Sequence, residues 1–201
     1  MGGIGVTGGK AANVIGRDAD LVIGVGTRFT DFTTSSKWLF NENRKVLGIN
    51  ICPFDAYKMD AEAIVADAKE AVKALISACE GYKTEYTNEI ENAKKEWDAI
   101  VDEYYSTELP GGLNQTLALG IINEFMGEDD IAVGSAGSLP GDMQRLFRPK
   151  NRGTYHMEYG YSNMGYEING ALGVKLAQPD KEVYTFCGDG SFPVSYTHLT
   201  L

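Results

Sequence analysis

A carboxylate between two glycines follows an apolar run near the end of the sequence, in Gly188-Asp189-Gly190-Ser191. Residues 182–187 before it have the composition of a buried strand. A carboxylate oxygen is the kind of hard ligand that Mg²⁺ or Ca²⁺ prefers. The flanking glycines would let backbone N–H groups reach phosphate oxygens with no Cβ in the way. Gly-Asp-Gly is also common turn chemistry, so the tetrapeptide alone allows a plain turn or a metal–phosphate site.

A second small turn, residues 134–138, follows the apolar run at 130–133. Ligands of open α/β sheets bind at the carboxyl ends of the strands, which is where both turns are expected. Residues 164–179 between them have a helical pattern that carries three glycines, Gly165, Gly170 and Gly173. Because glycine destabilises a helix interior, these glycines predict the close approach of another backbone or of a ligand.

The rest of the chain alternates between short apolar runs and amphipathic segments. Strands are expected at residues 20–26, 45–51 and 62–67, and helices at 10–19, 68–80 and 115–126. This alternation predicts an α/β fold with open parallel sheets. Residues 81–108 are polar and charged with one narrow apolar stripe, which predicts a solvated connecting helix. We therefore expect a first domain at residues 1–80, a helical linker at 81–110 and a second domain at 111–192.

The composition limits the classes of partner and the compartment that we expect for this chain. The formal net charge of −10 over 201 residues argues against nucleic acid or an anionic membrane as the main partner. The three cysteines, Cys52, Cys79 and Cys187, are far apart and show no metal-binding spacing, which favours a reducing cytoplasm. No apolar run is long enough to predict a membrane span.

Longer stretches around the two turns resemble a known family. The residues "CGDGSF", with "EYGYSNMGYEINGALGVKLAQPDKEV" before them, resemble the cofactor-binding domain of thiamine diphosphate-dependent enzymes. The stretch "DLVIGVGTRFTDFTT" resembles their central, Rossmann-like domain. Others, such as "GSAGSLPGDMQRLF", are similar to members that open a cyclic 1,2-diketone ring in the breakdown of myo-inositol. The resemblance implies a hydrolase that uses thiamine diphosphate and Mg²⁺ to cleave a C–C bond of such a small molecule.

The resemblance also implies roles at the turn after residue 187. Asp189 would be a ligand of Mg²⁺, and the metal would bridge the diphosphate. Gly188, Gly190 and Ser191 would frame the metal and the phosphate oxygens.

Four further residues take roles from the same resemblance. Gly137 and Ser138 would contact the diphosphate. Met164 would be the apolar wedge that bends the cofactor, and the carbonyl of Asn163 would accept a hydrogen bond from the cofactor's amino group.

Two features of the family have no counterpart in the sequence. The family's activating glutamate and the asparagine that closes its metal motif cannot be assigned, so no catalytic residue is named. Glu158 and Glu167 are interpreted as surface or helix-capping carboxylates. Pro193 and the β-prone residues after it are expected to break the helix that should follow the turn. Residues 193–201 are therefore predicted to be a non-native tail, and the chain to be a fragment that binds the cofactor weakly and has no turnover by itself.

Two other functions stay open at this point. An acetolactate synthase-type carboligase of 2-oxoacids would share the fold and the cofactor. A nucleotide-binding protein without catalysis would explain the strand–turn segment at residues 20–32 with no need for Mg²⁺. For the enzyme, the expected form at full length is a homo-oligomer.

Overall fold

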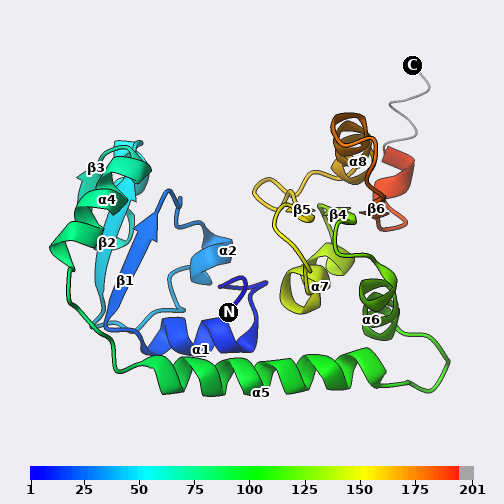
Figure 1. Ribbon diagram of the computed structural model, residues 1–201, viewed down its shortest axis with the longest axis horizontal. Helices are drawn as coiled ribbons and strands as arrows, with labels where there is room; N and C mark the ends of the chain where they lie inside the picture. The colour runs from blue at the N-terminus through cyan, green and yellow to red at the C-terminus, as the bar shows by residue number, and fades with distance from the viewer. Residues whose placement is uncertain (195–201) are drawn as a thin grey trace. The chain divides into compact units, whose positions relative to one another are not determined.

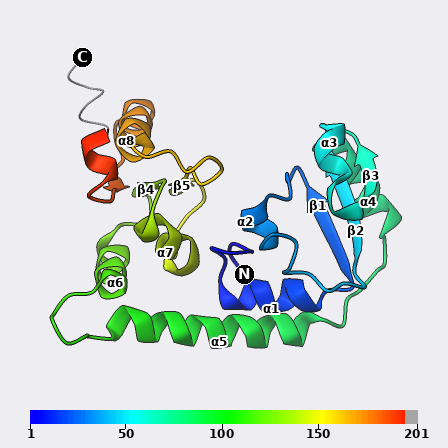
Figure 2. The same ribbon diagram turned by 180° about the vertical axis from the view of Figure 1, so that it is seen from behind.

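The computed structural model describes residues 1–194, and the chain in it divides into two compact units. The first runs over Met1–Asp98 and the second begins at Ala99. Figure 1 and Figure 2 show the ribbon from two opposite sides. Within the described residues, no helix combines the length and the apolar character that crossing a membrane requires.

The first unit contains a parallel sheet of three strands in the order β1-β2-β3. Its strands are β1 (Leu21–Val25), β2 (Lys45–Asn50) and β3 (Glu62–Val65). The pairing sets Val22 beside Val46 and Leu47 beside Glu62. All three strands lie in the segments expected from their apolar runs.

Short helices connect these strands. They are α1 (Lys10–Asp18), α2 (Asp31–Thr34), α3 (Pro53–Ala56), the 3₁₀ turn η1 (Lys58–Asp60) and α4 (Ala68–Ala78). The start of α4 is fixed by Asp67, whose carboxylate accepts hydrogen bonds from the backbone N–H groups of Lys69 and Glu70. The buried core of this unit is formed by Phe40, Val46 and Met59.

A long helix, α5 (Thr87–Ser106), follows the first sheet, as the polar segment predicts. Among its residues only Val101, which belongs to the expected apolar stripe, is buried. The division between the two units falls within α5, inside the segment expected to be the linker.

The second unit has its own parallel sheet, in the order β5-β4-β6. Its strands are β4 (Ile131–Gly134), β5 (Tyr155–Met157) and β6 (Val183–Phe186). Every residue of β4 is buried, because this strand lies in the middle of the sheet. Ala132 pairs with Tyr155 on one side and with Tyr184 on the other.

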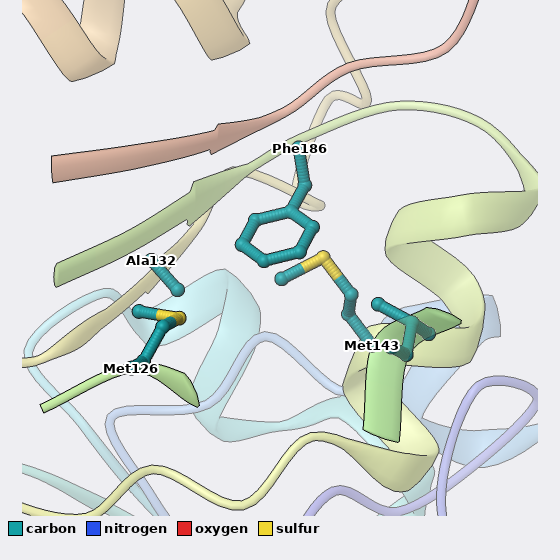
Figure 3. Close-up of a cluster of buried hydrophobic side chains, with 5 residues drawn as sticks. Met126, Ala132, Met143 and Phe186 are labelled. Carbon is teal, nitrogen blue, oxygen red and sulfur yellow. The ribbon is translucent and has the colours of Figure 1, made fainter. Parts of the chain in front are cut away.

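Three helices complete the second unit: α6 (Gln115–Phe125), α7 (Ser138–Leu146) and α8 (Tyr166–Ala177). Five buried side chains form its core, Leu119, Met126, Ala132, Met143 and Phe186. Figure 3 shows the ring of Phe186 directed toward the thioether of Met143. These core residues come from α6 and the residue that follows it, and from β4, α7 and β6, so the core fixes where the ends of β4 and β6 lie.

The expected α/β architecture with parallel sheets is confirmed, and three local expectations are wrong. Gly165 is not inside α8 but caps its start with φ 91°, and a Cβ at Gly170 would meet the ring of Tyr166 from the same helix. A Cβ at Gly173 would meet no atom within 4 Å, so no backbone approaches there.

A further correction concerns the segment after the Gly188–Ser191 turn. Residues 191–194 are helical, so Pro193 does not prevent a helix from starting. Proline is tolerated in the first turn of a helix because the N–H groups there have no intrahelical partner. Most of the predicted non-native tail, residues 195–201, lies outside the described residues, and its origin stays a prediction.

Candidate cofactor site

A cavity of about 600 Å³ is formed by three segments of the second unit together with Gln115, the first residue of α6. These are the turn after β4, the segment before α8 and the turn after β6. The lining residues are Gln115, Ala136, Gly137, Ser138, Leu139, Ser162, Met164, Cys187, Gly188, Asp189, Gly190 and Ser191. Because β4 and β6 are adjacent and parallel, their carboxyl ends bring two of the three segments to the same edge of the sheet.

The first segment is a glycine turn that leads directly into α7. Gly137 has φ 101° and ψ −170°, a conformation that is open essentially to glycine alone. It precedes Ser138, the first residue of α7. The first N–H groups of a helix have no intrahelical acceptor and carry its positive dipole end. This turn therefore offers backbone donors of the kind that bind phosphate oxygens.

The second segment contributes an apolar side chain. Met164 is half exposed and lines the cavity between Ser162 and the start of α8. A Cβ at Gly190 would come within 3.2 Å of the Met164 methyl carbon, so Met164 lies against the third segment.

The third segment is a tight turn. The backbone N–H groups of Ser191 and Phe192 both donate to the carbonyl of Gly188, at 3.1 Å each. Ser191 is buried, whereas Asp189 is exposed at the tip of the turn. The Oδ1 atom of Asp189 accepts a hydrogen bond from the N–H of Gly190 at 2.9 Å. The turn thus holds one carboxylate at the cavity and orients it by its own backbone.

Seven of the eight site residues predicted from the sequence line this cavity, and Asn163 does not. The carbonyl of Asn163 accepts hydrogen bonds from Ser135 Oγ at 2.8 Å and from the N–H of Tyr166 at 3.4 Å. Its proposed bond to a cofactor would have to share that oxygen with these donors.

Glu158 holds the loop that leads to Met164. Its carboxylate accepts hydrogen bonds from the N–H groups of Tyr161 at 2.9 Å and Asn163 at 3.0 Å. Ser135 Oγ lies 3.2 Å from the same carboxylate and shares its one proton between it and the carbonyls of Glu158 and Asn163. Partial burial raises the pKa of Glu158, but the two backbone hydrogen bonds and the contact with Ser135 together bring it below its ordinary value. The loop is therefore held by a carboxylate that is ionised at neutral pH.

Glu167 is a residue that the sequence interpretation misplaced. Its side chain is fully buried, with 0% exposed, so it is not a surface carboxylate. It does cap α8, because Oε2 accepts a hydrogen bond from the N–H of Gly165 at 2.8 Å. Its other oxygen, Oε1, accepts from the N–H of Ala136 at 3.1 Å, in the turn after β4. The sequence carried no signal for this second bond, because its donor is 31 residues away.

Cys187 is half-buried and lies beside the same carboxylate. Burial raises the pKa of the Cys187 thiol above its ordinary value, and the negative charge of Glu167 raises it further. The thiol is therefore protonated at neutral pH, which makes it a weak nucleophile and a poor metal ligand.

The cavity residues fit a metal ion that takes most of its ligands from a bound molecule. In the described part of the chain, no three His, Cys, Asp or Glu side chains cluster as a metal site. Asp189 is the one carboxylate among the described residues that line the cavity. Mg²⁺ commonly binds to one or two carboxylates and completes its shell with phosphate oxygens and water.

Comparison with known proteins agrees with this arrangement. Residues 135–200 match the family described as thiamine pyrophosphate enzyme, C-terminal TPP binding domain, and residues 1–75 match the thiamine pyrophosphate enzyme central domain. Thiamine pyrophosphate is another name for thiamine diphosphate. Together the two matches cover more than half of the chain, which thus belongs to the thiamine pyrophosphate enzymes and carries a central and a C-terminal domain of that family.

Particular relatives are also similar over almost the whole chain. It is 49% identical to a 3D-(3,5/4)-trihydroxycyclohexane-1,2-dione hydrolase of Geobacillus thermodenitrificans and 47% identical to one of Clostridium tetani. A hydrolase of the same name from Bacillus thuringiensis is 48% identical. Each match covers 99% of this chain and 35% of the relative, so the chain spans about a third of their length.

Proposed function

We propose that the cavity binds thiamine diphosphate together with Mg²⁺. The observation that carries this proposal is the meeting of three chemically different walls at one cavity of about 600 Å³. The turn at Gly137 and Ser138 offers N–H donors to the diphosphate, Asp189 offers a carboxylate to the metal, and Met164 offers an apolar surface to the rings. This volume is ordinary for a site that takes a ligand the size of a cofactor.

The roles of the remaining predicted residues follow from their place in the walls. Gly188, Gly190 and Ser191 would frame the metal and the phosphate oxygens, and Asn163 would offer its carbonyl to the cofactor's amino group. Thiamine diphosphate, when bound, supplies the carbanion that attacks a carbonyl and the ring that accepts the electrons of the broken C–C bond. The chain's own residues bind and orient it and keep one face of it away from water.

We further propose that the whole protein is a hydrolase that cleaves a C–C bond of a cyclic 1,2-diketone in inositol breakdown. Support comes from the relatives of that name, which are 47–49% identical over 99% of this chain. We assign it to the cytoplasm, with a small-molecule substrate and no nucleic-acid partner, because the net charge is −10 and the three cysteines show no disulfide or metal spacing. A homo-oligomer is part of the same proposal.

The binding proposal is tested by titrating the ¹⁵N-labelled chain with thiamine diphosphate, with and without Mg²⁺. We expect Mg²⁺-dependent shifts of the amide resonances of Gly137, Ser138 and Gly190, even if affinity is weak. Asp189→Asn should abolish the dependence on Mg²⁺, whereas Asp180→Asn, at an exposed position of the same unit, should not change it. Shifts that do not need Mg²⁺, or that spare these residues, would contradict the proposal.

Testing the substrate proposal requires the parts of the relatives that lie outside the match with this chain. A chimera can supply them: the matching segment of the Geobacillus hydrolase is replaced by residues 2–192 of this chain. We expect the chimera to open the ring of the trihydroxycyclohexanedione and the same chimera with Asp189→Ala to be inactive. A chimera that folds and binds the cofactor but leaves the dione intact would contradict the substrate assignment.

A further inference from the structure

Glu167 is the one buried carboxylate in the described part of the second unit that joins different segments of the cavity. Burying an ionised carboxylate is costly unless hydrogen bonds replace its hydration. Here the replacement comes from backbone N–H groups on two separate segments, Ala136 after β4 and Gly165 at the start of α8. Each donor is next in sequence to a residue that lines the cavity, Gly137 in one case and Met164 in the other.

The strand that leads to the third cavity segment is also tied to this residue. Thr185, in β6, donates from Oγ1 to the main-chain carbonyl of Glu167 at 2.6 Å. Thr185 lies three residues before Gly188, in the strand that precedes the turn after β6. Glu167 therefore contacts two of the cavity segments through its side chain and the strand before the third through its backbone.

Both linked segments contain a glycine at positive φ, Gly137 at 101° and Gly165 at 91°. Glycine can adopt many backbone conformations at little cost, so contacts with the surroundings must select the one that is observed. The carboxylate of Glu167 binds the N–H beside Gly137 and the N–H of Gly165 itself, so it links the two glycine turns directly.

We propose that Glu167 is a positioning residue: its buried carboxylate sets the place of Met164 relative to the Gly137–Ser138 turn and thereby the affinity for thiamine diphosphate. The proposal rests on the proposed function for the identity of the ligand. Glu158 also joins these two segments, through Ser135 and the loop at 161–163, but it is only half-buried and bonds neither Ala136 nor Gly165.

The test uses two variants and a matched control in the full chain. Glu167→Gln keeps the shape but turns one acceptor oxygen into an NH₂ group, so one of the two N–H groups loses its acceptor. Glu167→Ala removes both acceptors. Glu128→Gln makes the same chemical change at an exposed position of the same unit.

The ligand-free measurement is the nuclear Overhauser effect between the Met164 methyl group and the Gly190 backbone. We expect it in the wild type and in Glu128→Gln, weaker in Glu167→Gln and absent in Glu167→Ala, with the sheet resonances of β4 and β6 retained. An unchanged effect in folded Glu167→Ala would overturn the proposal. If neither variant folds, hydrogen exchange of the wild type decides, because rapid exchange of the Ala136 and Gly165 amides would show that the carboxylate does not hold them.

The ligand measurement separates this inference from the proposed function. Losing one of the two hydrogen bonds lets Met164 and the Gly137–Ser138 turn move apart, so we expect the binding of thiamine diphosphate with Mg²⁺ to weaken about tenfold in Glu167→Gln. Wild-type binding that the variant retains in full would overturn the role of Glu167 and leave the proposed function standing. Absence of binding to the wild type would count against the proposed function, and the Met164–Gly190 effect would still decide the positioning role.

Discussion

Met164 lies against Gly190: a Cβ placed at position 190 would be 3.2 Å from the Met164 methyl carbon. A contact of this length is tighter than most real Cβ contacts, so a side chain at position 190 would press on the Met164 methyl group. Glycine at position 190 therefore leaves room for the side chain of Met164, 26 residues earlier, as well as for a ligand. Through this contact, the apolar side chain of Met164 packs against the turn that carries Asp189.

Gly190→Ala should displace Met164 by a few tenths of an ångström. The Met164 side chain is flexible and half exposed, so the free energy of unfolding should change by about 1 kcal/mol or less. The methyl resonance of Met164 should nevertheless move, and thiamine diphosphate should bind more weakly. Gly188→Ala is the control for the methyl resonance, because a Cβ there meets no atom within 4 Å. An unmoved methyl signal in Gly190→Ala would refute the contact.

Gly137→Ala should destabilise the second unit. Alanine at φ 101° and ψ −170° is strained whatever the space around it, at a cost of about 1–3 kcal/mol. Gly173→Ala should instead stabilise the unit, because Gly173 is inside α8 with open space at its Cβ position. Alanine in a helix interior should raise the free energy of unfolding by about 0.5–1 kcal/mol relative to glycine. Urea denaturation of both variants measures the two changes in free energy of unfolding. Stabilisation by both substitutions, or destabilisation by both, would contradict the backbone conformation at Gly137 or the helical environment of Gly173.

The contribution of Glu158 to stability should depend on pH. Its pKa in the folded chain is below the ordinary value of 4.5, so its stabilising effect is complete above that value and is lost as the pH falls through the folded pKa. The difference in free energy of unfolding between the wild type and Glu158→Gln should thus be constant near neutral pH and shrink below pH 4.5. A difference that grows in acid would mean that the carboxylate is not held by these hydrogen bonds.

Tyr105 should ionise late and be costly to replace. Burial raises the pKa of its hydroxyl to about 12, against the opposing charge of Arg148. The hydroxyl donates to the carbonyl of Leu146 at 2.6 Å, so Tyr105→Phe should lose about 1–2 kcal/mol of stability, measured by denaturation below pH 10. That contribution should fall as the pH rises from 10 toward 12. An alkaline absorbance titration in which Tyr105→Phe removes a group ionising near pH 10 would contradict the buried environment.

The sequence predicted the longer elements and missed the short ones for identifiable reasons. Strands β1, β2, β4 and β6 were visible as short apolar runs, and the structure has a strand in each of these runs. Strand β5 is only Tyr155–Met157, too short to show a period. Helix α7 begins with Ser138, Leu139, Pro140 and Gly141, residues typical of a turn, yet proline is acceptable in a first turn.

The site was predictable where one local motif carries the chemistry and not where distant segments meet. Asp189 between two glycines and the glycine–serine turn at Gly137 are visible in the sequence. The burial of Glu167 is not, because it depends on Ala136 in another turn. The engagement of the Asn163 carbonyl by Ser135 depends in the same way on a contact between segments 28 residues apart.

The most direct test of a thiamine diphosphate site in this cavity is a search for nuclear Overhauser effects between the bound cofactor and the methyl group of Met164, with Mg²⁺ present. We predict effects from the cofactor's thiazolium ring to this methyl group, together with their loss in Asp189→Ala. Cofactor contacts that fall instead on the turn after β1 in the first unit, or that are indifferent to Asp189→Ala, would contradict the assignment of the cavity.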